Sequence, residues 1–241
     1  MQKVKAIIAY DGGYFKGFQK QKSTKNTITT QIEIALHSLG IKNEIIGSGR
    51  TDAGVHATGQ VIDFLVPDFW KDLNKLKWEL NRKLKYISFK HISFVSDEFH
   101  SRFSAKKRVY RYIFKTSIPS IFEQNHVSYY PSFNRELLES SLQLFEGVHD
   151  FSNFIKTGSI THTNIRYIYK AYYRPFNKYH VIYFEANGFL RSQVRMMVEA
   201  AMQGALGKLS LEEIKGQLEL KERYITKLAP PEGLYLARIT Y

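Results

Sequence analysis

Apolar residues along the chain follow two spacings, one typical of strands and one typical of helices. Residues 4–10, 109–115 and 180–186 alternate and predict half-buried strands, whereas residues 27–39, 68–84 and 190–206 carry apolar positions three and four apart and predict helices. The remaining pattern adds strands at 44–48, 60–66, 86–95, 167–173 and 233–241, and helices that begin near Asn134 and Ser210.

Polar residues at the ends of these segments supply start and stop signals. Thr30-x-x-Glu33 and Ser210-x-x-Glu213 have the spacing of capping boxes. Asp68 and Asn134 can cap the helices that follow them, and Gly147 can end the second of these. Arg174-Pro175 should separate the strands at 167–173 and 180–186.

The order of the elements predicts an α+β fold. Helices and antiparallel-type strands mix in both halves, without the regular βαβ spacing of a doubly wound sheet. We therefore expect two similarly built lobes that share one sheet. The basic stretch near residues 100–108 is the best candidate for their junction, which gives an N-terminal lobe of residues 1–103 and a C-terminal lobe of residues 104–241.

The charge of the chain indicates a polyanionic partner. Lys and Arg total 35 against 22 Asp and Glu, a net charge of +13. Three stretches that contain no acid, residues 12–32, 99–122 and 151–184, concentrate this excess. Phosphate contacts are the natural use of such blocks, although a solvated lysine-rich face is the simpler alternative.

Aromatic residues lie among these cations. In KKRVYRYIFK, alternation puts Tyr110, Tyr112 and Phe114 on one face of the strand, and Arg111 and Lys115 on the other. Rings beside cations are typical of proteins that bind looped or single-stranded nucleic acid, but the same alternation also describes an ordinary core face.

Other features exclude several classes of protein. The chain has no cysteine, which excludes disulfides and thiolate zinc sites. No run approaches the roughly 18 apolar residues of a membrane span, and MQKVKAIIAY lacks the pattern of a signal peptide. We expect a cytoplasmic protein with no membrane partner.

One short stretch, GSGRTDAGVHATGQ at 47–60, has a composition that favours a functional site. Its four glycines suggest a backbone that approaches a ligand closely. Asp52 lies two residues from Arg50, and a neighbouring cation favours the carboxylate form that a nucleophile or base requires. A turn in which Arg50 pairs structurally with Asp52 is the alternative. No second ligand stands at metal spacing beside His56, so we expect no metal.

The stretch GRTDAGVHATGQV resembles the signature of the tRNA pseudouridine synthase A family. Other segments resemble that family in the same order along residues 4–241: YDGGYFKGFQKQ, KRVYRYIF, GVHDFSNF, NGFLRSQVRMMV and APPEGLYL. Two positions depart from its pattern. Phe18 stands where tryptophan is usual, and Lys221-Glu222-Arg223 stands where Asp-Arg is common.

The resemblance implies a fold, an activity and a set of site residues. It implies two ferredoxin-like lobes that share a central, mostly antiparallel sheet with a cleft between them. The expected activity is isomerisation of uridine to pseudouridine at positions 38–40 of the tRNA anticodon stem-loop, by a homodimer without a cofactor. Asp52 would be the catalytic aspartate, accompanied in substrate binding by Arg50, Tyr110, Arg195 and Leu234.

Several alternatives stay open. Asp52 can attack C1′ of the ribose, as in retaining glycosidases, or remove the 2′ proton to give a glycal. A non-catalytic RNA-binding or chaperone protein could keep the same basic surface, but it would have no need of an acid in a basic groove. A sugar hydrolase is disfavoured because no second carboxylate lies near Asp52 in the sequence.

Overall fold

The computed structural model describes residues 1–156, 158 and 161–241, which form two compact units. The first unit comprises Met1–Lys106 and Leu236–Tyr241, and the second comprises Lys107–Tyr235. The described residues form ten strands and five α-helices. Six of the strand pairs are antiparallel, and the pair between residues 107–115 and 128–129 is parallel. The predicted α+β class is confirmed. Among these helices none has the length and apolarity needed to cross a bilayer.

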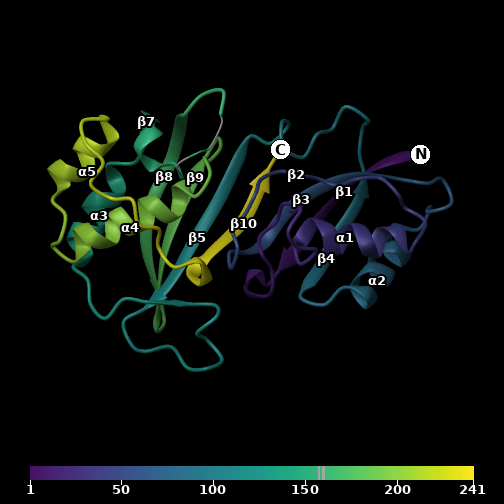
Figure 1. Ribbon diagram of the computed structural model, residues 1–241, viewed down its shortest axis with the longest axis horizontal. Coiled ribbons are helices and arrows are strands. Elements are labelled where there is room, and N and C mark those ends of the chain that lie inside the picture. The colour runs from purple at the N-terminus through teal and green to yellow at the C-terminus, as the bar shows by residue number, and fades with distance from the viewer. Residues whose placement is uncertain (157, 159–160) are drawn as a thin grey trace. The chain divides into compact units, whose positions relative to one another are not determined.

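The first unit is a sheet with two helices (Figure 1). Its elements are β1 (Gln2–Tyr10), α1 (Ile28–His37), β2 (Ile46–Gly47), β3 (His56–Val66), α2 (Leu73–Lys83), β4 (Ile87–Phe94) and β10 (Leu234–Thr240), of which residues from Leu236 onward belong to this unit. The strands are ordered β4-β1-β3-β10, and β2 pairs with β3.

The core of the first unit follows from the two spacings in the sequence. Alternate residues of β1 are buried, from Val4 to Tyr10. Ile32 and Leu36 of α1 and Leu76 and Leu80 of α2 are fully buried. Because helical residues four apart share a face, each helix covers the sheet with one apolar stripe.

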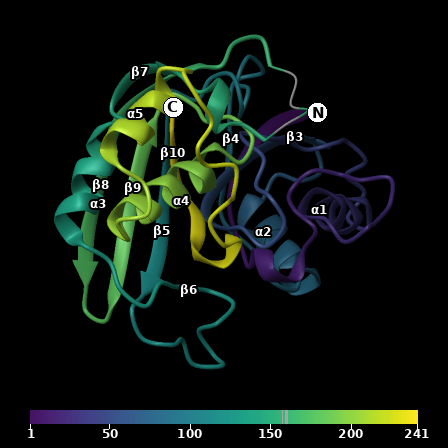
Figure 2. The same cartoon turned by 60° about the vertical axis from the view of Figure 1, so that its left-hand side comes forward.

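The second unit repeats this organisation with three helices (Figure 2). Its elements are β5 (Lys107–Lys115), β6 (Ser128–Tyr129), α3 (Arg135–Gln143), β7 (Gly147–Asp150), β8 (Ile165–Phe176), β9 (Tyr179–Ala186), α4 (Gln193–Ala205) and α5 (Leu211–Leu218). The strands are ordered β5-β9-β8-β7, and β6 pairs with β5 in parallel. The three helices pack on one another, and α3 also packs on β8.

Three short 3₁₀ turns complete the two units. They span Gly12–Tyr14, Ser152–Phe154 and Pro231–Gly233. The first belongs to the first unit, and the other two belong to the second unit.

One predicted capping box and one predicted helix start are wrong, although both helices exist and α1 begins where the sequence placed it. Thr27, not Thr30, caps α1, and its side chain accepts a hydrogen bond from the Thr30 amide. Asp72 caps α2 by accepting from two amides, whereas Asp68 forms an ion pair with the amino group of Met1 at 3.0 Å. Asp72, four residues after Asp68, is therefore the N-cap of α2 in place of the predicted Asp68.

The predicted break at Arg174-Pro175 is also wrong, because β8 continues to Phe176 and the chain turns at Asn177, whose φ is 53°. The strand tolerates Pro175 because β7 pairs with β8 only up to Ile168, so no hydrogen bond from residue 175 is required on that side. β3 begins at His56, four residues before the predicted start.

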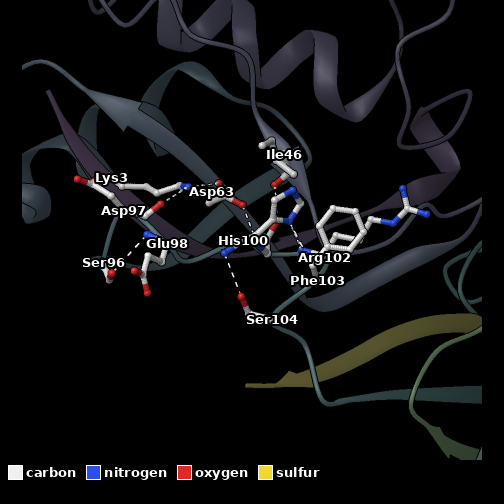
Figure 3. A network of polar contacts seen from close by, with 11 residues as sticks. Lys3, Ile46, Asp63, Ser96, Asp97, Glu98, His100, Arg102, Phe103 and Ser104 are labelled. Carbon is white, nitrogen blue, oxygen red and sulfur yellow. Dashed lines mark hydrogen bonds and ion pairs between the residues drawn. The ribbon is translucent and has the colours of Figure 1, made fainter.

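A buried acid connects the segment 96–104 to the sheet of the first unit (Figure 3). Asp63 of β3 is 1% exposed and accepts a 2.8 Å hydrogen bond from the Ser101 amide. The Lys3 ammonium lies 3.8 Å from its other oxygen and donates to the Asp97 carbonyl. The Ser101 hydroxyl donates to the carbonyl of Ile46 in β2. The segment before the second unit is thereby held against three strands.

Candidate active site and RNA-binding residues

Asp52 lies in a turn whose backbone is held on both sides. The Thr51 hydroxyl is buried and bonds with the Tyr10 hydroxyl at 2.8 Å, and the Thr51 carbonyl accepts from the Phe18 amide at 3.1 Å. The Asp52 carbonyl accepts from the Val55 amide at 3.2 Å, which closes the turn. Asp52 itself is half-buried. A turn fixed in this way places the backbone of Asp52 before a substrate binds.

Arg50 extends from the same turn into solvent. Its side chain is exposed, and no hydrogen bond or ion pair joins it to a residue in the described part of the chain. The structural pairing of Arg50 with Asp52, which the sequence left open, is therefore absent among the described residues. Next to it, Gly49 has open space where a side chain would be. This guanidinium is available to an anionic ligand.

Three of the four glycines in the motif are explained by the fold itself. A Cβ at Gly47 would lie 2.4 Å from the Phe18 ring, and one at Gly59 would lie 2.3 Å from the carbonyl oxygen of Ala237 in β10. Gly54 has a φ of 80°, which favours glycine. The predicted approach of backbone to a ligand is therefore not what these three positions require.

His56 and Gln60 also have structural partners. His56 is 1% exposed, and its Nδ1 accepts a 3.1 Å hydrogen bond from the Gly12 amide. Gln60 is fully buried, donates to the Gly49 carbonyl at 2.8 Å and accepts from the Ser48 hydroxyl at 3.2 Å. Both side chains lie on β3 and hold the loop from one side. Sequence reasoning missed these roles, although polar residues within an apolar strand are the signal for them.

The second unit contains the other predicted site residues, beginning with Tyr110 on β5. Tyr110 is buried, and its ring meets Phe189 edge to face with centroids 5.1 Å apart. Tyr112 is fully buried and donates to the Ser128 hydroxyl at 2.8 Å. Burial raises the pKa of the Tyr112 hydroxyl. The predicted shared face is confirmed, and Tyr112 packs in the interior as expected. Phe189 was not predicted as a site residue.

Arg195 and Leu234 are linked through the segment 229–234. Arg195 of α4 is half-buried, donates from Nε to the Ala229 carbonyl at 2.7 Å, and accepts at its own carbonyl from the Ala229 amide at 3.1 Å. Leu234 is 4% exposed at the start of β10. A Cβ at Gly233 would lie 2.7 Å from the Ile113 carbonyl oxygen, so this segment packs directly on β5. Within the second unit, α4 and β5 thus hold one segment between them.

The structure gives the contacts of the two positions that depart from the family pattern. Phe18 is 3% exposed and packs on Gly47 and, with its ring tilted, on Tyr10. The side chain at position 18 therefore makes apolar contacts, which the phenylalanine ring provides without the indole N–H of the usual tryptophan. In the second unit, Arg223 donates to the Ile155 carbonyl at 2.7 Å. Nothing in these contacts alters the turn around Asp52.

The basic blocks divide into paired and unpaired cations. Acids from elsewhere in the chain form ion pairs with Lys20, Lys107, Lys115 and Lys178. Five exposed lysines form no ion pair with the described residues: Lys16, Lys22, Lys25, Lys106 and Lys170. The absence of acids within a stretch of sequence therefore overestimates the charge that a polyanion can contact.

Comparison with known proteins identifies the family. The family model described as tRNA pseudouridine synthase matches residues 6–126 and 142–241. A tRNA pseudouridine synthase A of Helicobacter hepaticus is 40% identical over 248 residues, covering 100% of both chains. Those of Wolinella succinogenes and Campylobacter jejuni are each 38% identical, covering 98% and 100% of this chain and 93% and 100% of their own. This chain therefore belongs to the tRNA pseudouridine synthase family.

Proposed function

We propose that this tRNA pseudouridine synthase, an isomerase, acts on uridines 38–40 of the anticodon stem-loop, with Asp52 as its catalytic residue. The observation that carries the proposal is the turn that holds a half-buried Asp52 between fixed neighbours. Thr51 and Val55 fix the backbone before and after it. An exposed Arg50 lies in the same turn, where an RNA phosphate can reach it.

The reaction breaks the N1–C1′ bond of uridine and forms a C5–C1′ bond. C5 loses one proton and N1 gains one, so the product is an isomer of the substrate. The uracil must leave its stack before a protein group can reach C1′. Asp52 then either attacks C1′, or removes the 2′ proton so that a glycal forms. Both routes need an ionised carboxylate at the start, and both return it unchanged.

Tyr110 is proposed to contact the extruded uracil. Its ring is fixed by Phe189, and its neighbour in the strand pairing is Phe184 of β9. A fixed aromatic ring provides a stacking surface, and its hydroxyl can assist loss of the C5 proton directly or through water. Arg195 and Leu234 are proposed to line the same site.

The tRNA partner is supported by the exposed lysines without ion pairs, which can follow the RNA backbone. We further infer a homodimer and a cytoplasmic location. The homodimer rests on the resemblance to the family, and the location rests on the tRNA substrate. Sedimentation with and without tRNA tests the first inference.

The decisive experiment maps pseudouridine in an unmodified tRNA after incubation with the wild-type protein and with Asp52→Asn and Arg50→Gln. We expect pseudouridine at positions 38–40 with the wild type and none with Asp52→Asn, which should still bind tRNA. Arg50→Gln should retain the position but react slowly. Near-normal turnover of Asp52→Asn would contradict the role of Asp52, and pseudouridine only at other positions would contradict the proposed target.

A further inference from the structure

Gly188 occupies a position at which the fold does not require glycine. It follows β9, its φ lies outside the left-handed region, and a Cβ built on it would meet no atom closer than 3.7 Å. Alanine would therefore fit this backbone. The atoms nearest to that Cβ belong to two arginines, with Arg166 Nε at 3.7 Å and Arg108 Nη1 at 4.0 Å. A side chain here would fill the space in front of both guanidinium groups.

Arg166 presents one edge of its guanidinium to this space. Its Nη1 donates to the carbonyls of Thr163 and Ile165, at 2.9 and 2.6 Å. Neither Nε nor Nη2 has a hydrogen-bond partner among the described residues, and no carboxylate there pairs with the group. Partial burial and the nearby Arg108 lower the pKa of Arg166. The Nε–Nη2 edge is the one that binds two oxygens of a phosphate at once.

Arg108 is held in position from the other side of the turn. Its Nη1 donates to the Asn187 carbonyl at 2.8 Å. Asn187 in turn is fixed to Tyr167 of β8 through a 3.2 Å backbone bond and a 3.1 Å bond to its side-chain oxygen. The turn and both arginines are therefore ordered without a ligand. Two cations this close repel each other, and a bound anion would remove the repulsion.

We propose that Arg108 and Arg166 bind one backbone phosphate of the tRNA above Gly188. The proposal rests on the proposed function, because tRNA supplies the phosphate. All the residues concerned belong to the second unit. A phosphodiester fits the site because its two free oxygens can accept from the Nε–Nη2 edge of Arg166 while the charge of Arg108 attracts it. Gly188 keeps the approach open.

The alternative is that both arginines only brace loops, since each donates to backbone carbonyls. The two roles differ in what Gly188 does. If the arginines only hold loops, a side chain that fits at residue 188 should leave tRNA binding unchanged. If they bind a phosphate, that side chain should block the phosphate and weaken tRNA binding.

The test measures tRNA affinity over a series of salt concentrations for the wild type, Gly188→Ala, Gly188→Val and Arg166→Gln. Loss of one phosphate contact should weaken binding and reduce the slope of log affinity against log salt by about 0.7 to 0.9. Gly188→Val and Arg166→Gln should each show this loss, and the variant that combines both substitutions should show no further loss. Gly188→Ala should lie between the wild type and Gly188→Val. Arg174→Gln removes an exposed arginine from the same strand and serves as the matched control for charge.

The outcomes separate this proposal from the proposed function. A melting temperature recorded for each variant shows whether it is folded. If Gly188→Val is folded and keeps the wild-type slope, the phosphate site is wrong, even if Arg166→Gln fails to fold. If the wild type forms no pseudouridine in any tRNA, the proposed function is wrong. If pseudouridine forms while the slopes of Gly188→Val and Arg174→Gln are equal, only the phosphate site is wrong.

Discussion

The hydroxyl groups of Tyr10 and Thr51 form a 2.8 Å hydrogen bond between two buried side chains. Tyr10 ends β1, in the middle of the first sheet, and Thr51 directly precedes Asp52. The bond therefore connects a rigid strand to the proposed catalytic turn. It also gives a reason for the first tyrosine of the YDGG segment, which the sequence could only match to a family pattern.

Removal of this bond should loosen the turn more than it weakens the fold. In Tyr10→Phe we expect the free energy of unfolding to fall by about 1 kcal/mol, the typical net value of one hydrogen bond. Turnover should fall while tRNA affinity stays unchanged. Urea unfolding and single-turnover rates measure the two effects. Tyr241→Phe is the control, because it removes a bond to the Ser101 carbonyl in the same unit. Equal turnover in both variants would contradict a role in holding Asp52.

The two buried tyrosines of β5 should respond differently to loss of their hydroxyls. Tyr110→Phe keeps the ring and its contact with Phe189, so tRNA affinity should survive. The rearrangement should slow by about 10² to 10⁴-fold, the usual contribution of general acid–base assistance. Tyr112→Phe should instead destabilise the fold by about 1 kcal/mol, through the lost bond to Ser128. If Tyr112→Phe loses turnover and Tyr110→Phe retains it, the assignment of Tyr110 is wrong.

Lysines of the same basic block should contribute unequally to tRNA binding. The Lys20 ammonium lies 2.6 Å from Glu33 and 2.9 Å from Glu44, and these carboxylates raise its pKa. Exposed Lys16 has no ion pair among the described residues. Lys16→Gln should therefore reduce the salt dependence of affinity by about 0.7 to 0.9 log units per log salt, and Lys20→Gln should leave it nearly unchanged. The reverse order would show that Glu33 and Glu44 release Lys20 to the RNA.

Acid should weaken the second unit through Glu123. Its carboxylate accepts from the Tyr179 hydroxyl at 2.6 Å and contacts the ammonium groups of Lys178 and Lys115, which lowers its pKa below the ordinary 4.5. Because the folded pKa is the lower one, the stabilisation is present above pH 4.5 and is lost as the pH falls below it. Glu123→Gln should be less stable than the wild type at pH 7, and the difference should shrink at pH 3. Urea midpoints at both values measure it, and a constant difference would contradict the linkage.

The sequence predicted most elements because their apolar spacing coincides with what each unit buries. Val4, Ile8, Leu76 and Leu80 fall on buried faces, as their periods require. Errors arose where two nearby polar residues could serve the same purpose, as with Asp68 and Asp72, because local sequence does not reveal which one meets the free amides.

For the site, the sequence indicated candidate residues but not the residues that hold them in place. The family motif identified Asp52 and Tyr110 as candidates, but the partners that fix them are distant in sequence. Tyr10 and Phe18 hold Thr51 from more than thirty residues away. The pairing of Lys115 and Lys178 with Glu123 likewise depends on the folded chain, so the net charge of a sequence window could not reveal it.

The strand β10 has a consequence for synthesis of the protein. It pairs beside β3 in the first unit, yet it follows the whole second unit along the chain. During translation, the part of the β3 edge that β10 will occupy, beyond the residues already paired with β2, must therefore stay open until more than a hundred further residues have emerged. Open strand edges invite pairing with other chains, and pairing over such a separation is slow. The unit that carries Asp52 is therefore completed only after the whole second unit has been synthesised.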